Sequence, residues 1–515
     1  MWEKLSNSSL IFSRNFLKTN NNDFYNNPAF IHQIYNYYIF KGYYNLISNK
    51  IINIFVSNFI VFFLLFFANC VDLYGILTLD SKVNVEDFIK INNFFNINYF
   101  MWILLIVFYI ITFMKIISVI DDIYLYKNIG KFFKNTLNIY DKELDYIEWD
   151  TIINSIKDKT NHELDIFYIN NIITSKDNYF IYLLDNNVIQ LNFLNKLLEW
   201  NLYFCIFFSI YNNNFKINDN IFTEKDKYSN KIKMKMRIIS IINLILMPFI
   251  LTLISFYYLF SYGELFYNNP QTIISRGYSN RQKWRYRLYN ELQHEFDKRI
   301  KDTEKYSTEY IYLFKNKLLI IIFRLMIFIL SSILLVLVFL SIINDKILVN
   351  LIIFPNKPVL WVIGILAPLI AIFRNYILIE TKRDPEKVLE DLQKYIFISN
   401  ELVDNAYRNW VYKTIAKNFT FKGIIFIKDI ISIILTPFNL WNISYYSNQI
   451  LDSILQNTSP HNRLGFICNN SNFEEYNDIN IEKNSLEEKS INYFCRKYTY
   501  WQPNNVNSIK INIIQ

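Results

Sequence analysis

Long apolar stretches without charged side chains are the feature of this sequence that most restricts its fold. Residues 51–71 and 91–114 contain no Asp, Glu, Lys or Arg. A helix needs about 20 mostly apolar residues to cross the hydrocarbon core of a membrane. Hydrophobic residues make up 52% of the chain, and they gather in such blocks instead of being scattered at helical or strand spacing. This pattern predicts an all-α polytopic membrane protein.

Six apolar blocks follow one another, and the distribution of Lys and Arg predicts their topology. They cover residues 51–71, 91–114, 238–263, 318–344, 358–373 and 430–451. Lys and Arg are retained on the cytosolic side of a membrane, so the basic segment before the first block predicts a cytosolic N-terminus. The acidic segment 72–90 is then lumenal. The short connection between the fourth and fifth blocks predicts two crossings joined by a lumenal turn.

The block at residues 238–263 has basic clusters on both sides, at residues 225–237 and 276–301. A simple crossing would place one of these clusters in the lumen, against the usual charge bias. Pro248 in this block and Pro437 in the sixth block are expected to break the helix. We therefore predict four transmembrane helices plus two re-entrant membrane helices, with cytosolic helices between them and both termini cytosolic. An ordinary six-span protein is the alternative.

The remaining sequence divides the chain into seven segments around these blocks. The stretch from Asp452 is polar and Asn-rich, which predicts poor packing. The predicted segments are a cytosolic N-terminal segment (1–50), the first two transmembrane helices with a lumenal loop (51–120), a cytosolic helical region (121–235), a re-entrant helix with cytosolic helices (236–316), the third and fourth transmembrane helices (317–380), cytosolic helices with the second re-entrant helix (381–451) and a C-terminal cytosolic tail (452–515).

Polar side chains within or next to the apolar blocks are candidate functional residues, because a charge in a membrane usually faces a polar cavity or a partner. A wet groove lined by such groups would let a lipid headgroup cross while its tails stay in hydrocarbon. The planar donor fork of arginine suits phosphate. The lipid-path candidates are Arg324, Arg374, Asn243, Glu264, Ser331 and Ser332. The alternatives are that Arg324 pairs with a helix C-terminus or snorkels, and that Arg374 is an anchor at the membrane interface.

The sequence has no motif that indicates a metal site, an enzyme active site, an ATP site or a nucleic-acid-binding site. The four cysteines form no C-x-x-C pair and the four histidines do not cluster, so we expect no metal and no cofactor. The sequence has no Walker loop, no H-E-x-x-H and no basic run joined to a nucleic-acid-reading motif. We therefore expect neither covalent catalysis, ATP-driven pumping nor nucleic-acid binding. Glu291, His294 and Glu295 stand at helical spacing, where a charged helix face is favoured over a metal site.

Several segments resemble the autophagy-related protein 9 family. Residues 289–296, YNELQHEF, are similar to its F-N-E-L-x-H-E-L signature. The match defines a cytosolic motif comprising Asn290, Glu291, His294, Glu295, Arg276 and Arg287. Weaker matches follow in family order around the same apolar blocks, at residues 34–42, 70–72, 148–149, 163–179, 248–264, 436–437 and 465–468.

The resemblance implies a domain-swapped homotrimer with a central polar pore. It implies ATP-independent phospholipid scrambling during autophagosome formation, on Golgi-derived cytoplasmic vesicles and the phagophore membrane. The expected partners are phospholipids, a bridge-like lipid-transfer protein and other autophagy factors. Two alternatives stay open from the residues alone: a homo-oligomeric ion channel or small-solute transporter, and a structural vesicle component that docks partners.

Overall fold

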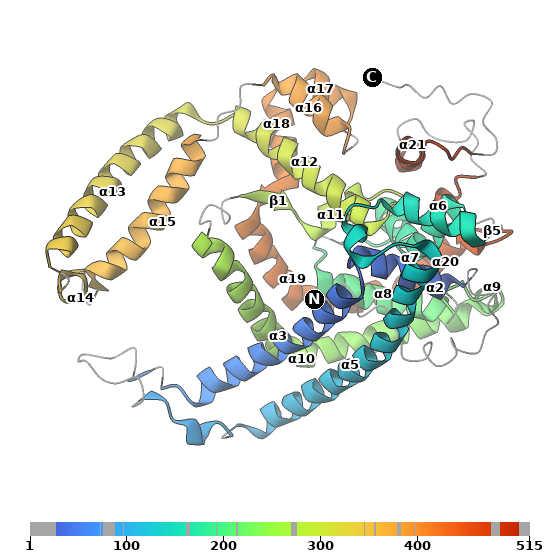
Figure 1. The fold of residues 1–515 in the computed structure, drawn as a ribbon, viewed down its shortest axis with the longest axis horizontal. Coiled ribbons are helices and arrows are strands. Elements are labelled where there is room, and N and C mark those ends of the chain that lie inside the picture. The colour runs from blue at the N-terminus through green and yellow to red at the C-terminus, as the bar shows by residue number, and fades with distance from the viewer. Residues whose placement is uncertain are drawn as a thin grey trace. The chain divides into compact units, whose positions relative to one another are not determined.

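The chain folds into two compact units that are both mainly helical, as the computed structural model shows (Figure 1). Unit 1 comprises residues 1–257, 287–294 and 433–515, and unit 2 comprises residues 258–286 and 295–432. The structure describes residues 27–503 except 73, 76–87, 96, 161–164, 192, 213–214, 269–274, 345, 355–356, 379–382, 397 and 475–484.

The first two apolar blocks form a pair of long helices in unit 1, α3 (Tyr43–Asn69) and α5 (Tyr99–Phe132). Val61, Leu65 and Leu105 are buried between them. The predicted start of the second block at residue 91 is wrong, because residues 91–93 form a 3-10 turn, η3 (Ile91–Asn93), and the helix begins only at Tyr99. Asparagines interrupt the sequence before residue 99, and asparagine competes for backbone hydrogen bonds in a helix interior.

The two proline-containing blocks form α10 (Lys225–Asn268), which is longer than predicted, and α19 (Lys422–Ser444), which begins and ends earlier in the sequence than the predicted block 430–451. The expectation that Pro248 and Pro437 break these helices is wrong, since each proline lies inside a continuous helix. Proline removes one backbone donor and favours a bend, and packing can hold the helix together around it. Figure 1 shows that the ribbon of α10 changes direction part-way along its length. The division into four crossings and two re-entrant helices stays a prediction that rests on charge distribution.

The last two long apolar helices form an antiparallel hairpin in unit 2, α13 (Lys317–Ile343) and α15 (Val359–Leu378) (Figure 1). Their connection contains α14 (Ile347–Asn350) and a small antiparallel pair of strands, β2 (Ile352–Phe354) and β3 (Lys357–Pro358). Leu337, Val359 and Val362 form the buried contact at this end of the hairpin. The short connection predicted between these two blocks is confirmed.

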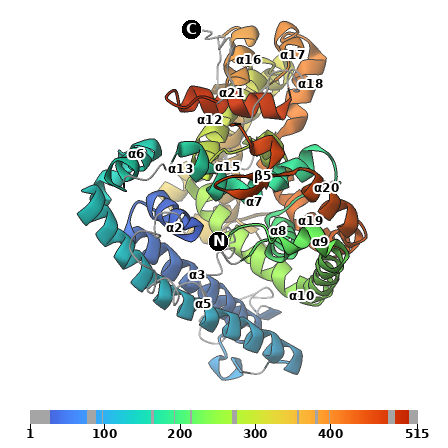
Figure 2. The same cartoon turned by 90° about the vertical axis from the view of Figure 1, so that its right-hand side faces the viewer.

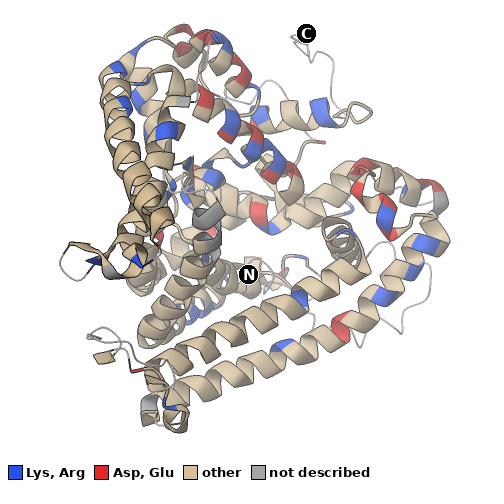
Figure 3. Ribbon diagram, turned by 60° about the vertical axis from the view of Figure 1, so that its left-hand side comes forward, with Lys and Arg blue, Asp and Glu red and all other residues tan. Residues whose placement is uncertain are grey.

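Six described helices are long and apolar enough to cross a membrane, namely α3, α5, α10, α13, α15 and α19. In their most apolar windows only 6–28% of the residues are buried within the single chain. Figure 3 shows that charged residues are sparse along these long helices and concentrate on shorter ones. Such exposed apolar surfaces are compatible with a lipid environment, so the predicted class of all-α polytopic membrane protein is confirmed.

The polar part of unit 2 surrounds a core of its own. Strand β1 (Arg276–Tyr278) pairs antiparallel with β4 (Phe419–Phe421), with Gly277 opposite Thr420. The hydroxyl of Tyr310 donates to the carbonyl oxygen of Ala406 at 2.6 Å inside this core. The helices around the core are α11 (Asn280–Tyr286), α12 (Gln293–Leu313), α16 (Pro385–Gln393), α17 (Asn400–Asp404) and α18 (Asn409–Asn418).

The polar part of unit 1 gathers segments from both ends of the chain around α7 (Ile166–Asp185), as Figure 2 shows for α20 and β5. Its helices include α2 (Pro28–Ile39), α6 (Trp149–Thr160), α8 (Lys196–Ile210), α9 (Asn220–Thr223), α20 (Ser447–Gln456) and α21 (Leu486–Lys497), with short turns η4 (Phe133–Leu137), η5 (Asp141–Asp145) and η7 (Asn469–Ser471). Strands β5 (Thr458–His461) and β6 (Gly465–Cys468) form an antiparallel hairpin.

The prediction of a poorly packed C-terminal stretch is wrong for its described residues. The ring of Trp501 stacks on Phe167 at a centroid distance of 5.6 Å, and Phe494 packs against Phe473 at 5.5 Å. Ser490 of α21 is fully buried and its hydroxyl accepts a hydrogen bond from the backbone N–H of Tyr289 at 3.1 Å. The prediction followed the high asparagine content and overlooked the aromatic residues of this stretch. Phe494, Tyr498 and Trp501 pack α21 and the residues after it against unit 1.

Glu487 at the start of α21 gives the docking of this helix a pH dependence. Burial raises the pKa of its carboxyl to about 7, although a hydrogen bond from Asn470 opposes the shift. The unfolded carboxyl has lost its proton above about pH 4.5. Between these values the folded state holds more protons than the unfolded state, so this group's contribution to stability falls as pH rises from about 4.5 to 7. We expect Glu487→Gln to stabilise the protein at pH 8.

At pH 8 the expected gain in the free energy of unfolding is about 1 kcal/mol for Glu487→Gln. This is less than the whole pKa difference would give, because the carboxyl is only partly buried. Thermal unfolding of the variant and the wild type at pH 5 and pH 8 measures it. The two proteins should differ little at pH 5 and clearly at pH 8. An equal difference at both pH values would contradict titration of Glu487 as the cause.

Candidate functional site

The signature YNELQHEF begins as a tight loop and continues into α12. Asn290 has a backbone φ of 55°, in the left-handed region that asparagine tolerates better than most residues. Helix α12 begins at Gln293, so Glu291 precedes it. Glu291 and Glu295 are only 2% and 6% exposed. The prediction that Glu291, His294 and Glu295 share one charged helix face is therefore wrong for Glu291, which lies before the helix, and both carboxylates are buried. Within the described residues, no group of three or more His, Cys, Asp or Glu could hold a metal ion.

Asn290 is the centre of a buried hydrogen-bond network that ties this loop to α7. Its backbone N–H donates to Asn178 Oδ1 at 2.9 Å, and its side-chain Oδ1 accepts from Asn178 Nδ2 at 2.9 Å. Asn171 Nδ2 also reaches Oδ1 at 3.2 Å, while Asn290 Nδ2 donates to the carbonyl oxygen of Ser471 at 2.7 Å. Every polar atom of the Asn290 side chain is thus satisfied away from water, which buried amides require.

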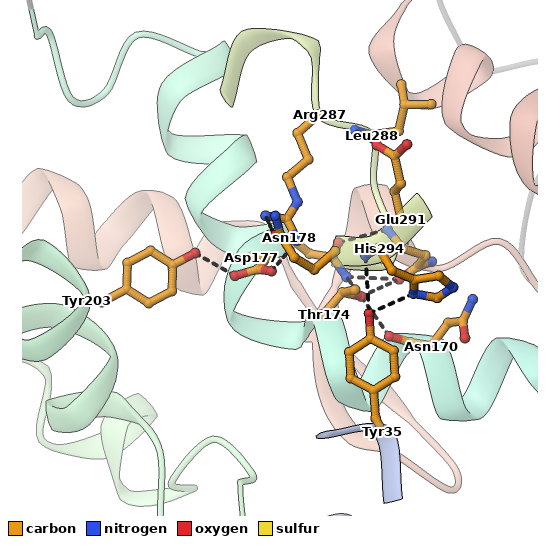
Figure 4. Close-up of polar contacts among 12 residues, drawn as sticks. Tyr35, Asn170, Thr174, Asp177, Asn178, Tyr203, Arg287, Leu288, Glu291 and His294 are labelled. Carbon is orange, nitrogen blue, oxygen red and sulfur yellow. Dashed lines mark hydrogen bonds and ion pairs between the residues drawn. The ribbon is translucent and has the colours of Figure 1, made fainter. Parts of the chain in front are cut away.

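Asp177 joins the buried Arg287 and the partly buried Tyr203 to the same face of α7, as Figure 4 shows. Its carboxylate accepts from Arg287 Nη2 at 2.7 Å and from the hydroxyl of Tyr203 at 2.5 Å. Burial lowers the pKa of the Arg287 guanidinium, but Asp177 together with Tyr203, Glu291 and Tyr35 outweighs burial, so the pKa is raised. Burial and Asp177 together hold the pKa of Tyr203 well above its usual range. Arg287 is therefore a fixed cation.

His294 connects the signature to α2. Its Nδ1 lies 3.0 Å from the hydroxyl of Tyr35 (Figure 4). The rings of Tyr35 and Tyr38 also pack on Trp149, at centroid distances of 5.1 and 5.2 Å. The signature therefore collects α2, α6 and α7 around one loop. This geometry indicates a structural role, because Asn290, Arg287 and His294 form hydrogen bonds with neighbouring helices instead of lining a cavity.

The structure divides the six predicted motif residues between the two units. Asn290, Glu291, His294 and Arg287 meet in unit 1, whereas Glu295 and Arg276 belong to unit 2. Arg276 Nη1 donates to the carbonyl oxygen of Phe419 at 2.9 Å, and its guanidinium lies 4.1 Å from the ring centroid of Phe421. Arg276 thereby holds the short sheet of unit 2.

The side chains that contact the signature were not predicted from the sequence as its partners. They lie on one face of α7 and in the turn η7, and are Asn171, Thr174, Asp177, Asn178 and Ser471. A signal for the first four was available, because polar side chains three or four residues apart form a stripe on an otherwise apolar helix. Nothing in the sequence pattern indicated that η7 would meet that stripe.

The two membrane arginines lie at one level of the α13–α15 hairpin. Phe323 stacks on Phe373 at a centroid distance of 4.7 Å, and each of these rings immediately precedes one arginine, Arg324 or Arg374. Both arginines are exposed in the single chain. Within the described residues, neither forms an ion pair or a hydrogen bond through its side chain. Arg324 is roughly 10 Å along the helix axis from Lys317, where α13 begins.

The other lipid-path candidates make contacts of their own or have side chains outside the described part of the structure. Ser331 and Ser332 donate their hydroxyls to the carbonyl oxygen of Phe328, at 3.1 and 2.7 Å, within their own helix. Asn243 belongs to unit 1, is 7% exposed, and its Nδ2 has no hydrogen-bond partner among the described residues. Glu264 lies in α10, and its side chain is outside the described part of the structure.

Six apolar helices, together with two polar helical cores, define the chain as a multi-pass helical membrane protein. A sequence model of the family described as Autophagy protein ATG9 matches residues 20–474. The chain belongs to this family, and the resemblance carried by the YNELQHEF signature is confirmed.

Individual relatives agree with the family assignment. The chain is 27% identical over 497 residues to Autophagy-related protein 9 of Saccharomyces cerevisiae, a match that covers 90% of the chain and 49% of the yeast protein. It is 27% identical over 511 residues to Autophagy-related protein 9 of Dictyostelium discoideum, covering 92% and 72%. The chain thus spans about half the length of its yeast relatives.

A solved structure shares the fold. The cryo-EM structure of Schizosaccharomyces pombe Atg9 aligns with a TM-score of 0.64 at 23% identity, covering 86% of this chain and 97% of that one.

Proposed function

We propose that this protein is an ATP-independent phospholipid scramblase that redistributes lipids between membrane leaflets during autophagosome formation. Membership of the autophagy family supports the pathway. The observation that carries the activity is the exposure of Arg324 and Arg374 at one level of two apolar helices, without a countercharge among the described residues.

Physical chemistry supports a polar path at these arginines. A charged side chain facing hydrocarbon near the middle of a membrane costs several kcal/mol, so such residues usually line water-filled cavities or pair with one another. Lipid headgroups cross a bare bilayer slowly because they must lose their hydration. A wet groove lined by arginines keeps the headgroup solvated and offers its phosphate fixed donors.

The groove would be completed by further copies of the chain. The apolar windows of the six long helices are mostly exposed in one chain, which leaves room for helix contacts between copies as well as with lipid. We accordingly propose the domain-swapped homotrimer implied by the family resemblance. We place it in Golgi-derived vesicles and the phagophore membrane with both termini cytosolic, where a bridge-like lipid-transfer protein and other autophagy factors would be its partners.

Reconstitution of the purified protein into liposomes tests the activity. A fluorescent phospholipid in the inner leaflet is expected to become accessible to a membrane-impermeant quencher without ATP, far faster than in empty liposomes. No acceleration by protein that is demonstrably inserted would contradict scrambling and favour a structural role in the vesicle. Single-channel currents from the same preparation would favour the ion channel.

A further inference from the structure

Arg237 is the last charged residue before the apolar part of α10, and it lacks the countercharge that Lys225 and Lys227 at the start of this helix have. Lys225 Nζ lies 2.5 Å from Asp452, and Lys227 Nζ lies 2.7 Å from Glu224. The guanidinium carbon of Arg237 instead lies 5.2 Å from the ring centroid of Trp441 and 5.3 Å from that of Tyr445. Among the described residues Arg237 has no ion-pair partner, and its buried Nε makes no hydrogen bond.

The two aromatic rings form a prepared surface for this guanidinium within unit 1. Trp441 lies in α19, and Tyr445 is the first residue after the end of this helix. The two residues are four positions apart, so both rings project to one side. Trp441 Nε1 donates to the hydroxyl oxygen of Tyr445 at 3.3 Å. The indole donor is therefore used, and the hydroxyl hydrogen of Tyr445 is left to donate elsewhere. The side chain of Tyr445 is largely exposed, so an external ligand can reach it.

Hydrogen bonds on both sides of Arg237 fix its helix against the aromatic residues. The hydroxyl of Ser240 donates to the carbonyl oxygen of Pro437 at 2.6 Å. On the other side, the hydroxyl of Ser229 donates to Asn448 Oδ1. Both hydroxyls are buried. The guanidinium and the rings are thus held together before any ligand arrives, which lowers the entropy that binding would otherwise lose.

The chemistry of this group selects an anion. A guanidinium stacked on aromatic faces keeps its N–H edge available for hydrogen bonds, and that edge matches two oxygens of a phosphate. The cation already covers the electron-rich faces of the rings, so a cationic ligand would meet repulsion. Tryptophan and tyrosine are also enriched where a membrane meets water.

We propose that Arg237, Trp441 and Tyr445 bind the phosphate of an anionic phospholipid where α10 enters the membrane. The site would load acidic lipids in preference to zwitterionic ones. The inference rests on the proposed lipid-handling function for its ligand class, but it concerns binding and is separate from transport and from the arginines of α13 and α15.

The test measures lipid association with the full chain in vesicles that contain spin-labelled phosphatidylserine or phosphatidylcholine. At high ionic strength, which screens diffuse surface charge, Arg237→Gln is expected to lower the preference for phosphatidylserine by about tenfold, the size of one charged hydrogen bond. Lys231→Gln is the matched control, because it removes the same charge from an exposed position of α10. Its preference should change less than about twofold, as expected for a screened surface charge.

Two further measurements keep the proposal testable if the Arg237→Gln variant does not fold. Arg237→Lys keeps the charge but loses the planar fork, and it should fall between wild type and Arg237→Gln. With wild-type protein, soluble glycerophosphoserine or inorganic phosphate should fail to displace the spin-labelled lipid. Displacement by either would assign the group to a soluble phosphate and overturn the lipid site. An equal loss in Arg237→Gln and Lys231→Gln, or none in either, would also overturn it.

Scrambling of phosphatidylcholine, measured on the same vesicles, separates the two proposals. If wild-type protein prefers phosphatidylserine through Arg237 but does not scramble, the binding site stands and the proposed function falls. If wild-type protein scrambles and Arg237→Gln keeps the lipid preference, the proposed function stands and the site falls.

Discussion

Scrambling by the Arg324→Leu variant is expected to be about tenfold slower than by the wild type, while the variant keeps its oligomeric state. Arg324 is exposed on α13 at the level where Phe323 stacks on Phe373. If its guanidinium stabilises a passing phosphate by about the strength of one charged hydrogen bond, its loss raises the barrier by at least 1.4 kcal/mol, which corresponds to tenfold in rate. The rate of fluorescence quenching in liposomes measures the effect.

Lys317→Leu is the matched control for this prediction. Lys317 is at the first position of the same helix, so its charge reaches the headgroup region and stays outside the proposed groove. Its rate should stay near that of the wild type. Arg324→Lys should retain part of the activity because the charge remains without the planar fork. If the Arg324→Leu protein scrambles at the wild-type rate, Arg324 is an anchoring residue.

Asp177→Ala is expected to produce the largest loss of stability. It removes the carboxylate that accepts from Arg287 at 2.7 Å and from Tyr203 at 2.5 Å, and it leaves the buried guanidinium of Arg287 without this counterion. Removing one partner of a buried ion pair costs about 3–5 kcal/mol. The thermal unfolding midpoint in detergent should fall by roughly 5–10 °C, as estimated from the entropy of unfolding of a large domain.

The double variant Asp177→Ala with Arg287→Met should recover part of the lost stability, because no uncompensated charge then remains buried. Glu224→Ala serves as the comparison, since it breaks the exposed pair with Lys227 and should leave the midpoint unchanged within error. A midpoint for Asp177→Ala that equals the wild-type value would show that the loop at residues 287–294 is not held through this carboxylate.

Only part of the functional geometry was predictable from local patterns. Phe323 and Phe373 lie in different apolar blocks, and no periodicity within either block could predict that their rings stack and bring Arg324 and Arg374 to one level. The signature residues were found by resemblance. Asn178 falls in the matched range 163–179, but neither Asn178 nor Asp177 was predicted to contact the signature. From the sequence, Arg237 was assigned to the basic cluster at residues 225–237. Its contact with the ring of Trp441 could not be predicted, because the two residues lie far apart in the chain.

The sequence by itself determined the class of this protein, because an uncharged apolar block long enough to span a bilayer has few soluble alternatives. It also determined the pairing of α13 with α15, since a short connection forces neighbouring helices to fold back on each other. Only the tertiary structure decided that Pro248 lies inside a continuous helix and that α21 packs into unit 1. It also decided that Asn290 joins its loop to α7 and η7 by hydrogen bonds. Each of these depends on contacts between residues far apart in sequence, whose free energy cannot be estimated from local composition.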